Sequence, residues 1–127
     1  PDTSMVTETD LAIESRWRAM IEKNFPGHGI FGEEFGNRDT DASHVWVLDP
    51  IDGTTAFIAG IPVYGSLIGL ARGGQPYLGV IDHPASNDRW VGVTGEMAMM
   101  NGSPVRTRQR TTLESAFMTS SNPDFFL

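Results

Sequence analysis

The sequence contains no cysteine, few basic residues and no long apolar run, and each lack excludes a class of protein. Without cysteine the chain forms neither disulfides nor thiolate metal sites. Its 9 basic residues stand against 16 acidic ones, a net charge of −7, which argues against a nucleic-acid-binding surface. No segment is apolar for long enough to span a membrane, and no signal peptide is visible. We therefore expect a cytoplasmic protein without nucleic-acid or membrane partners.

What is present is enough for one folded domain. The 127 residues are 39% hydrophobic, which suffices for a single core. The surplus of carboxylates suits a protein that binds a divalent cation, although an acidic surface is a commoner reason for it. The chain begins at Pro1 and closes on three apolar residues, Phe125–Leu127. We expect such an end to continue into a segment that buries it, so that the chain is part of a longer one.

One long helix is predicted near the start of the sequence. Thr7, with Asp10 three residues later, resembles a capping box, and the pair Pro26–Gly27 ends the helix at residue 24 or 25. The apolar face that we predict comprises Ile13, Trp17, Met20 and Ile21. The opposite, polar face carries Glu14, Arg16, Arg18, Glu22 and Lys23.

Short strands follow the helix. Apolar runs bounded by glycine, proline and asparagine predict strands at residues 29–32, 45–48, 64–71, 77–82, 90–94 and 97–100. A polar loop is expected at 37–43, and a short helix at 54–58. Glycine-rich turns predict that most of these strands pair as antiparallel hairpins. The expected fold class is α+β, one long helix packed on a mostly antiparallel sheet.

Acidic residues adjoin the ends of three of these elements. They are Asp10, Glu33 with Glu34, and Asp49 with Asp52. Hard cations such as Mg²⁺ prefer oxygen ligands in near-octahedral geometry. A strand that stops at Asp49 and turns through Pro50 could direct both aspartates at one point. The same turn would leave the Ile51 carbonyl free as a third ligand, and Glu33 could complete the set.

The residues that follow suit a phosphate group. Gly53 allows the backbone to approach a ligand closely, and a helix that begins at Thr54 would offer N–H groups to an anion. Two metal ions about 3.5–4 Å apart beside such a site can stabilise both the attacking and the leaving oxygen of a phosphoryl transfer. A simple turn is the commoner explanation of D-P-x-D-G-T, and Asp10 alone suits a helix start. The spacing by itself does not show that these residues converge.

Three motifs in this order resemble the inositol monophosphatase family of Mg²⁺-dependent, lithium-sensitive phosphatases. They are V-T-E-T-D at 6–10, G-E-E at 32–34 and D-P-I-D-G-T-T-A-F at 49–57. The segment G-E-M-A-M-M-N-G-S-P-V at 95–105 is similar to the hairpin that follows them in the family. The resemblance extends from about Asp2 to Phe126. It implies a Mg²⁺-dependent phosphomonoesterase.

The resemblance also implies a role for each site residue. Two or three Mg²⁺ ions are expected, with Mn²⁺ as a possible substitute. Their implied ligands are Glu33, Asp49, the Ile51 carbonyl and Asp52. Catalytic residues that polarise the attacking water would be Asp10 and Thr54. The substrate would be held by Asp52, Gly53 and Thr54.

Within the family, several stretches are most similar to the histidinol-phosphatase branch. They are F-I-A-G-I-P-V-Y-G-S-L-I-G-L at 57–70, L-G-V-I-D-H-P at 78–84 with D-R-W-V-G at 88–92, and A-F-M-T-S-S-N-P-D-F-F at 116–126. Thr55 departs from that branch, which often has a basic residue there, whereas inositol phosphatases often have threonine. Histidinol phosphate is the expected substrate. Inositol 1-phosphate or another sugar phosphate is the alternative, and a non-catalytic metal-binding regulatory module is the alternative outside the enzymes.

The family usually has segments beyond those seen in this sequence. One is a helix before the V-T-E-T-D motif, and the other is a second α/β half with a W-D-x-A-A motif whose aspartate is a further metal ligand. Residues 1–127 are therefore predicted to form an N-terminal metal- and phosphate-binding α+β domain. By itself this domain is expected to bind Mg²⁺ weakly and to turn over poorly or not at all. A small phosphorylated metabolite and a second copy of the chain, in a homodimer, are the implied partners.

Overall fold

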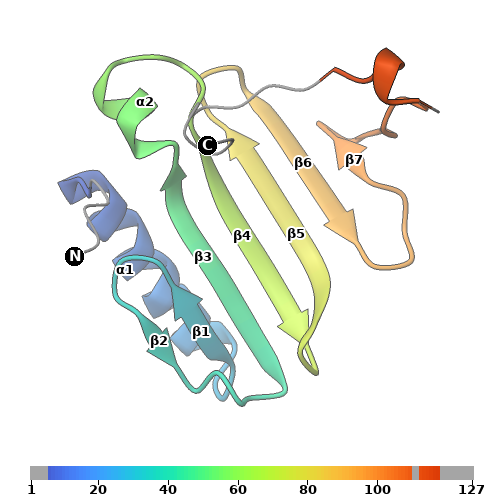
Figure 1. The fold of residues 1–127 in the computed structure, drawn as a ribbon. Coiled ribbons are helices and arrows are strands. Elements are labelled where there is room, and N and C mark those ends of the chain that lie inside the picture. The colour runs from blue at the N-terminus through green and yellow to red at the C-terminus, as the bar shows by residue number, and fades with distance from the viewer. Residues whose placement is uncertain (1–5, 110–111, 118–127) are drawn as a thin grey trace.

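One long helix lies against a mixed sheet of eight strands in the residues that this computed structural model describes, 6–109 and 112–117 (Figure 1). The elements are α1 (Glu8–Asn24), β1 (Gly29–Gly32), β2 (Asn37–Arg38), β3 (His44–Asp52), α2 (Thr54–Ile58), β4 (Gly65–Arg72), β5 (Gln75–His83), β6 (Asp88–Val93), β7 (Met99–Met100), β8 (Ser103–Pro104) and a 3₁₀ turn (Leu113–Ser115). No helix among these residues combines the length and the apolar character that crossing a membrane requires. The predicted α+β class is confirmed.

The strand order in the sheet is β2-β1-β3-β4-β5-β6-β7-β8. Only β1 and β3 pair in parallel, with Gly29 opposite Val45 and Gly32 opposite Leu48. Every other neighbouring pair is antiparallel. Parallel neighbours end at the same edge of a sheet, so the residues that follow β1 and β3 come together there. The Glu33 N–H donates to the Leu48 carbonyl at 3.2 Å, which extends this pairing by one residue.

The predicted start and end of α1 are confirmed. The Thr7 hydroxyl accepts from the N–H groups of Thr9 and Asp10, and the Asp10 carboxylate accepts from the Thr7 N–H at 2.9 Å. This is a complete capping box, with aspartate in the position that glutamate usually occupies. The helix ends at Asn24, where the predicted Pro26–Gly27 break follows.

The buried face of α1 differs from the prediction. Glu14, which we placed on the polar face, is completely buried, whereas Met20, placed on the apolar face, is 55% exposed. The inward stripe follows the spacing i, i+4, i+7, i+11 and consists of Asp10, Glu14, Trp17 and Ile21. Two of these four residues are carboxylates. A search for apolar residues alone therefore finds only half of the stripe.

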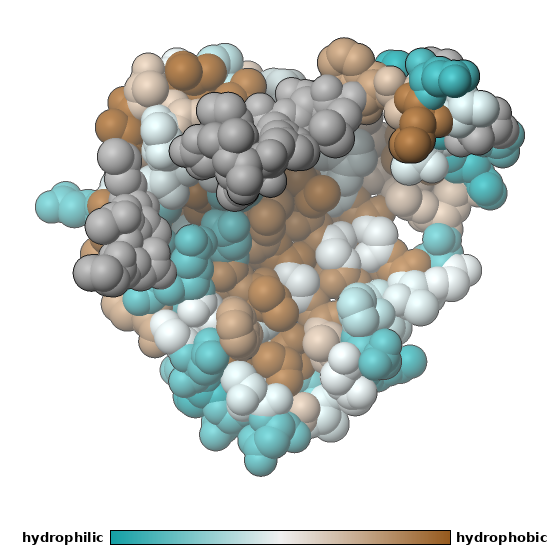
Figure 2. All heavy atoms as spheres, in the orientation of Figure 1, coloured by the Kyte–Doolittle hydropathy of each residue, from teal (hydrophilic) through white to brown (hydrophobic). Residues whose placement is uncertain are grey.

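The apolar core lies between α1 and one face of the sheet. Ile21, Ile30 and Leu48 form its buried centre, and Trp17, Trp46 and Ile68 pack against them. The opposite face is covered by no helix among the described residues. Figure 2 shows this face as a broad brown area across the middle of the molecule. The register of the strands places Phe31, Val47 and Ile81 on it, and each is about half exposed.

Strand β3 continues beyond the predicted end. We expected the strand to stop at Asp49, but the pairing with β4 resumes at Asp52, opposite Gly65. Asp49 lies opposite Leu67, so three steps along β3 match two along β4. This is a β-bulge, and such bulges redirect side chains near functional sites. Another difference is β2, which forms within the stretch that we predicted as a polar loop.

Candidate metal and phosphate site

The edge of the sheet where β1 and β3 end brings together two of the predicted metal ligands. The pKa of Asp49 is raised to about 7, first of all by burial. A hydrogen bond with the Glu33 carboxyl group and the negative charges of Glu33, Asp52 and Asp10 supply the rest of this increase in the pKa. Carboxylates that are crowded together in this way attract a cation, because a divalent ion removes the repulsion between them. The parallel pairing of β1 with β3 is what places Glu33 beside Asp49.

Asp10 approaches the same edge from the first turn of α1 and is 1% exposed. One of its carboxylate oxygens, Oδ2, accepts from the backbone N–H and the hydroxyl of Thr7. The other oxygen, Oδ1, is buried without a hydrogen-bond partner, and the same is true of Oδ1 of Asp49. Because buried polar atoms in folded proteins are almost always paired, these two oxygens are vacant acceptors.

The Ile51 carbonyl is not free, contrary to our expectation. It accepts a hydrogen bond from the Thr54 hydroxyl at 3.0 Å. A carbonyl oxygen has two lone pairs, so this bond leaves one of them for a further ligand. The bond also fixes the Thr54 hydroxyl as a donor toward Ile51, which leaves the lone pairs of its oxygen to accept from a neighbouring group.

The short helix α2 begins directly after the bulge. Gly53, its N-terminal cap residue, has φ of 84°, in the left-handed region that strongly favours glycine. No side chain caps α2 by a hydrogen bond. The first N–H groups of a helix have no partner within it, so those of Thr54 and Thr55 can donate to a bound anion.

The structure brings the predicted site residues to one region without closing them into a complete metal site. Within residues 6–109 and 112–117, no three acidic or histidine side chains converge closely enough to hold a metal ion. Asp52 and Gly53 are exposed, whereas Asp10 and Ile51 are buried. The individual roles assigned to these residues remain predictions.

The residues present fit a divalent cation. The donor set consists of carboxylate and carbonyl oxygens, which Mg²⁺ and Mn²⁺ prefer. Asp49 Oδ1, a buried oxygen of this set, and Oδ1 of the neighbouring Asp10 have no hydrogen-bond partner in the described part of the chain. Glu33, Asp49, Asp52 and the Ile51 carbonyl remain the predicted ligands of the ion.

Two carboxylates at this edge lie outside the predicted ligand set. Burial raises the pKa of Glu34, and the charges of Asp10, Glu33 and Glu14 raise it further. Glu14 is the residue that the sequence analysis missed. The signal that could have found it is the spacing of Asp10 and Glu14, four residues apart and in line with Trp17 and Ile21.

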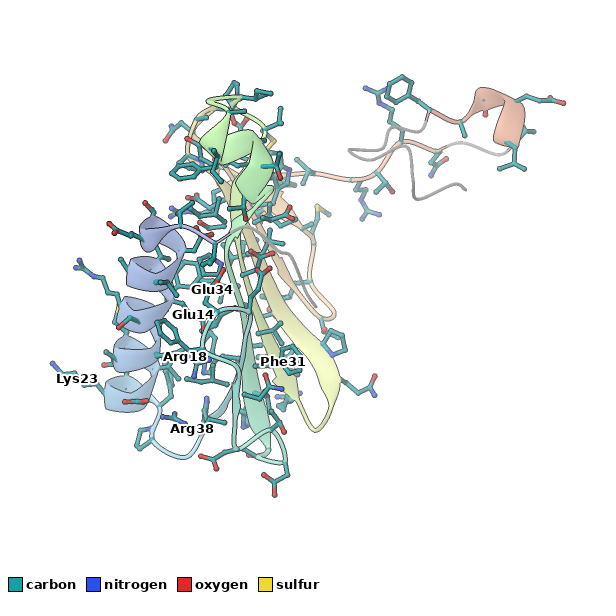
Figure 3. All side chains as sticks on the ribbon, turned by 60° about the vertical axis from the view of Figure 1, so that its left-hand side comes forward. Glu14, Arg18, Lys23, Phe31, Glu34 and Arg38 are labelled. Carbon is teal, nitrogen blue, oxygen red and sulfur yellow. The ribbon has the colours of Figure 1, made fainter. Side chains whose placement is uncertain are left out.

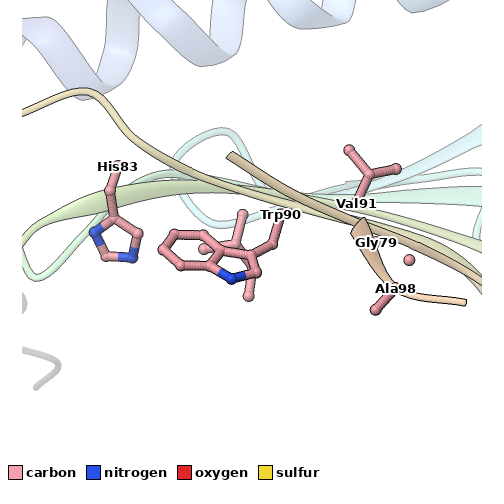
Figure 4. A pocket seen from close by; sticks show the side chains of 7 residues that line it. Gly79, His83, Trp90, Val91 and Ala98 are labelled. Atoms are coloured by element: carbon pink, nitrogen blue, oxygen red, sulfur yellow. The ribbon is translucent and has the colours of Figure 1, made fainter. Parts of the chain in front are cut away.

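A wide pocket on the described surface lies elsewhere. Its volume is about 530 Å³, and His83, Trp90 and Ile81 line it together with small residues of neighbouring strands. Figure 4 shows that the rings of His83 and Trp90 point to the side of the sheet away from α1. None of the predicted site residues lines this pocket.

Comparison with known proteins establishes the family. The sequence profile of the Inositol monophosphatase family matches residues 1–124. The chain belongs to the inositol monophosphatase family. A relative from Arabidopsis thaliana, named bifunctional phosphatase IMPL2, chloroplastic, is 43% identical over 98% of this chain and 37% of its own length. The histidinol-phosphatase of Mycobacterium tuberculosis is 38% identical over 98% of this chain and 48% of its own.

Solved structures of the family share this fold. The inositol monophosphatase from Anabaena superposes with a TM-score of 0.79 at 34% identity, over 83% of this chain and 42% of that one. The chain thus spans less than half the length of the inositol monophosphatase relatives that it matches. The resemblance seen in the three sequence motifs is confirmed at the level of the family and of the fold.

Proposed function

We propose that the full-length protein is a Mg²⁺-dependent phosphomonoesterase and that its substrate is histidinol phosphate. The observation that carries this proposal is the cluster of like charges at the end of β3. Burial and the neighbouring carboxylates hold the Asp49 pKa at about 7, directly beside a bulge and an uncapped helix start. Such a cluster is costly unless it serves a cation.

The reaction transfers a phosphoryl group to water. The water oxygen bonds to phosphorus, the bond between phosphorus and the alcohol oxygen breaks, and the products are inorganic phosphate and the free alcohol. When bound, Mg²⁺ would supply positive charge at the oxygens on which negative charge develops. The unpartnered Asp10 carboxylate oxygen and the Thr54 hydroxyl are acceptors that can orient the attacking water.

The phosphate group would be held by the backbone at the start of α2. The N–H groups of Gly53 and Thr54 would donate to its oxygens, and the left-handed conformation of Gly53 fixes their direction. A substrate that already lies against these groups needs little reorganisation to react. Asp52, which is exposed beside them, would orient the substrate together with the cation.

The choice of histidinol phosphate rests on sequence similarity. The relative from M. tuberculosis carries the name histidinol-phosphatase and is 38% identical over almost the whole chain. Inositol 1-phosphate is the second candidate, supported by Thr55 and by the Anabaena protein, which is named inositol monophosphatase. The deciding experiment compares phosphate release from the two substrates by the purified full-length protein, with Mg²⁺ and with EDTA.

Each result of that comparison has one meaning. A kcat/KM for histidinol phosphate well above that for inositol 1-phosphate supports the proposal and a place in histidine biosynthesis. The reverse order assigns the protein to the inositol phosphatases or sugar phosphatases. Mg²⁺ binding in calorimetry without turnover of either substrate would instead favour a non-catalytic metal-binding module.

We also propose that residues 1–127 are insufficient for catalysis. The relatives are more than twice as long as this chain, and the family resemblance assigns a further metal ligand to the part that they have in addition. The purified 127-residue chain should bind Mg²⁺ weakly and release little phosphate. Robust Mg²⁺-dependent release by this chain alone would refute the proposal.

The remaining proposals concern the setting of the enzyme. We propose a homodimer and a cytoplasmic location, with a small phosphorylated metabolite as the partner and no nucleic acid or membrane. The net charge of −7 and the lack of cysteine favour the location and the absence of a nucleic-acid partner, whereas the homodimer rests on the family resemblance. Light scattering of the full-length protein after gel filtration tests the dimer, because a monomeric mass contradicts it.

A further inference from the structure

The Glu14 carboxylate lies buried beneath the turn that follows Glu33. Its Oε2 oxygen accepts from the Glu34 N–H at 2.8 Å, and its Oε1 oxygen accepts from the Phe35 N–H at 3.2 Å. Figure 3 shows Glu14 between α1 and the strands, close to Glu34. Two successive backbone N–H groups thus donate to one carboxylate, which fixes the conformation of the turn between β1 and β2.

Arg18, one helical turn further along α1, completes this arrangement. Its Nε–H donates to Glu14 Oε1 at 2.7 Å, and its Nη2 donates to the Gly36 carbonyl. The same carbonyl accepts from the Gly32 N–H at 3.2 Å. We call Glu14 and Arg18 the carboxylate clamp, because together they bind three successive residues, 34–36, of the turn that follows β1. The Arg18 side chain is 16% exposed, so the pair is largely shielded from water.

Gly32 shows how closely the clamp approaches the backbone. A Cβ atom at this position would lie 2.1 Å from Glu14 Oε1 and 2.3 Å from Arg18 Nη2. Neither atom can retreat without breaking a hydrogen bond of the clamp. Glycine is therefore required in the G-E-E motif for a reason outside the metal ligands, namely the room that it leaves for Glu14.

Stability alone is a poor reason for this arrangement. A buried ion pair gains little net free energy, because the cost of removing both charges from water offsets their attraction. Glu14 moreover raises the pKa of the adjacent Glu34, so its charge is unfavourable for its acidic neighbours. What the clamp provides is geometry, since it holds the residues directly after Glu33.

We propose that Glu14 is a positioning residue for the metal site, which fixes the backbone that presents the Glu33 carboxylate to the cation. On one side, the Glu33 N–H is held by the Leu48 carbonyl. On the other, the next two N–H groups are held by Glu14. This inference rests on the proposed function, in which Glu33 is a metal ligand. Loss of such supporting groups typically costs about 10–100-fold in metal affinity.

The test replaces Glu14 by glutamine in the full-length protein. Glu14→Gln keeps the shape of the side chain but removes its charge and turns one acceptor into a donor that faces other donors. The dissociation constant for Mn²⁺ is measured by electron paramagnetic resonance at a temperature where circular dichroism shows each variant to be fully folded. We expect binding to weaken about tenfold or more. The matched control is Glu22→Gln on the same helix, an exposed partner of Arg38, which should bind Mn²⁺ as the wild type does.

Two further variants separate this inference from the proposed function. Glu33→Gln tests the ligand itself, and unchanged Mn²⁺ affinity in that variant means that the proposed ligand set is wrong. If Glu33→Gln weakens binding and Glu14→Gln does not, only the positioning role is overturned. The double variant should bind no more weakly than Glu33→Gln alone, because Glu14 acts through Glu33. If the losses of Mn²⁺ affinity from the two substitutions add up in the double variant, Glu14 does not act through Glu33.

If Glu14→Gln does not fold, a second variant, Glu14→Asp, still tests the proposal. Glu14→Asp keeps the charge beside Arg18 but withdraws the oxygens by about 1.5 Å, one carbon–carbon bond, from the two N–H groups. Mn²⁺ affinity equal to that of the wild type in this variant overturns the proposal. In the wild type, the Glu34 and Phe35 amides should exchange hydrogen as slowly as those of β1, although they lie in a turn. Rapid exchange there also overturns it.

Discussion

The elements α1, β1 and β3 carry or lead into two groups of residues that differ in chemistry and in burial, and we call them the acidic half and the apolar half. The acidic half consists of Asp10 and Glu14, which are buried, Asp49, which is partly buried, and Glu33, which is exposed. The apolar half consists of Trp17, Ile21, Ile30 and Leu48. Apolar burial stabilises a fold by about 25 cal/mol per Å², whereas carboxylate burial costs free energy unless a partner offsets it. The same helix and the same strands supply both halves, so stability and proposed function lie side by side in one layer.

The largest effect that we expect is on activity, from a change in the acidic half. Asp49→Asn in the full-length protein removes one proposed charged ligand. The loss of a few kcal/mol of charge stabilisation should reduce the rate about 100-fold or more. Unfolding in urea without metal should show no loss of stability, because the amide relieves repulsion from neighbouring carboxylates. Phosphate release measures the loss of activity, and urea unfolding shows whether the variant is still folded.

The control for that substitution is Asp39→Asn. Asp39 is an exposed aspartate after β2 with φ of 49°, a conformation that asparagine tolerates. The activity of the Asp39→Asn variant should equal that of the wild type. Near-normal activity of Asp49→Asn would show that the metal assignment is wrong.

The apolar half should respond in the opposite way. Ile21→Ala removes a side chain that is 6% exposed and should lower the free energy of unfolding by about 2–5 kcal/mol. Activity per folded molecule, measured well below the melting temperature, should change little. Met20→Ala is the neighbouring control, since Met20 is 55% exposed and its loss should cost within about 0.5 kcal/mol. Equal costs for the two variants would mean that the buried stripe of α1 is misassigned.

Thr7→Ala changes the N-terminal cap of α1, the helix that carries residues of both halves. It removes the hydroxyl that accepts from two N–H groups and contacts Asp10, which should cost about 1 kcal/mol in urea unfolding. Thr7→Ser keeps the hydroxyl and should recover most of that loss. The same loss in both variants would show that the methyl group, not the cap, carries the effect.

A further effect that we expect is a dependence of stability on pH in the metal-free protein. The pKa of Asp49 in the folded protein is about 7, above the 3.8 of an unperturbed aspartate. Its contribution to the free energy of unfolding is complete below pH 3.8 and is lost as pH rises through about 7. Urea unfolding at pH 5 and pH 7.5 should therefore show a steeper decline for the wild type than for Asp49→Asn. Parallel declines would contradict the raised pKa.

How far the sequence predicts the structure differs between the two halves. The helix ends and most strands and turns follow from local patterns such as the capping box at Thr7 and the turn at Gly73–Gly74, which the structure confirms, whereas β2, β8 and the extension of β3 were not predicted. The motifs also placed Asp49 and Glu33 in the site region. Their proximity itself depends on the parallel pairing of β1 with β3, a long-range contact that no local pattern encodes.

The burial of Glu14 could not be predicted from hydrophobic periodicity. A carboxylate on a helix is normally solvated, and Glu14 is buried only because two backbone N–H groups and Arg18 come from other positions to meet it. The bulge after Asp49 was not predicted either, because it too depends on a contact with a distant part of the chain. Proline and glycine indicate a turn, whereas the pairing of Asp52 with Gly65 keeps the segment in the sheet.

The pairing of β1 with β3 has a consequence for protein engineering. Because Glu33 is joined directly to Leu48, the connection from residue 39 to residue 43, between β2 and β3, contributes no predicted ligand and lies on the surface. The free-energy cost of lengthening such a loop grows only with the logarithm of its length. A peptide tag could thus be inserted between Thr40 and Asp41, at the end of β1 and β3 that lies opposite to the candidate metal site (Figure 1).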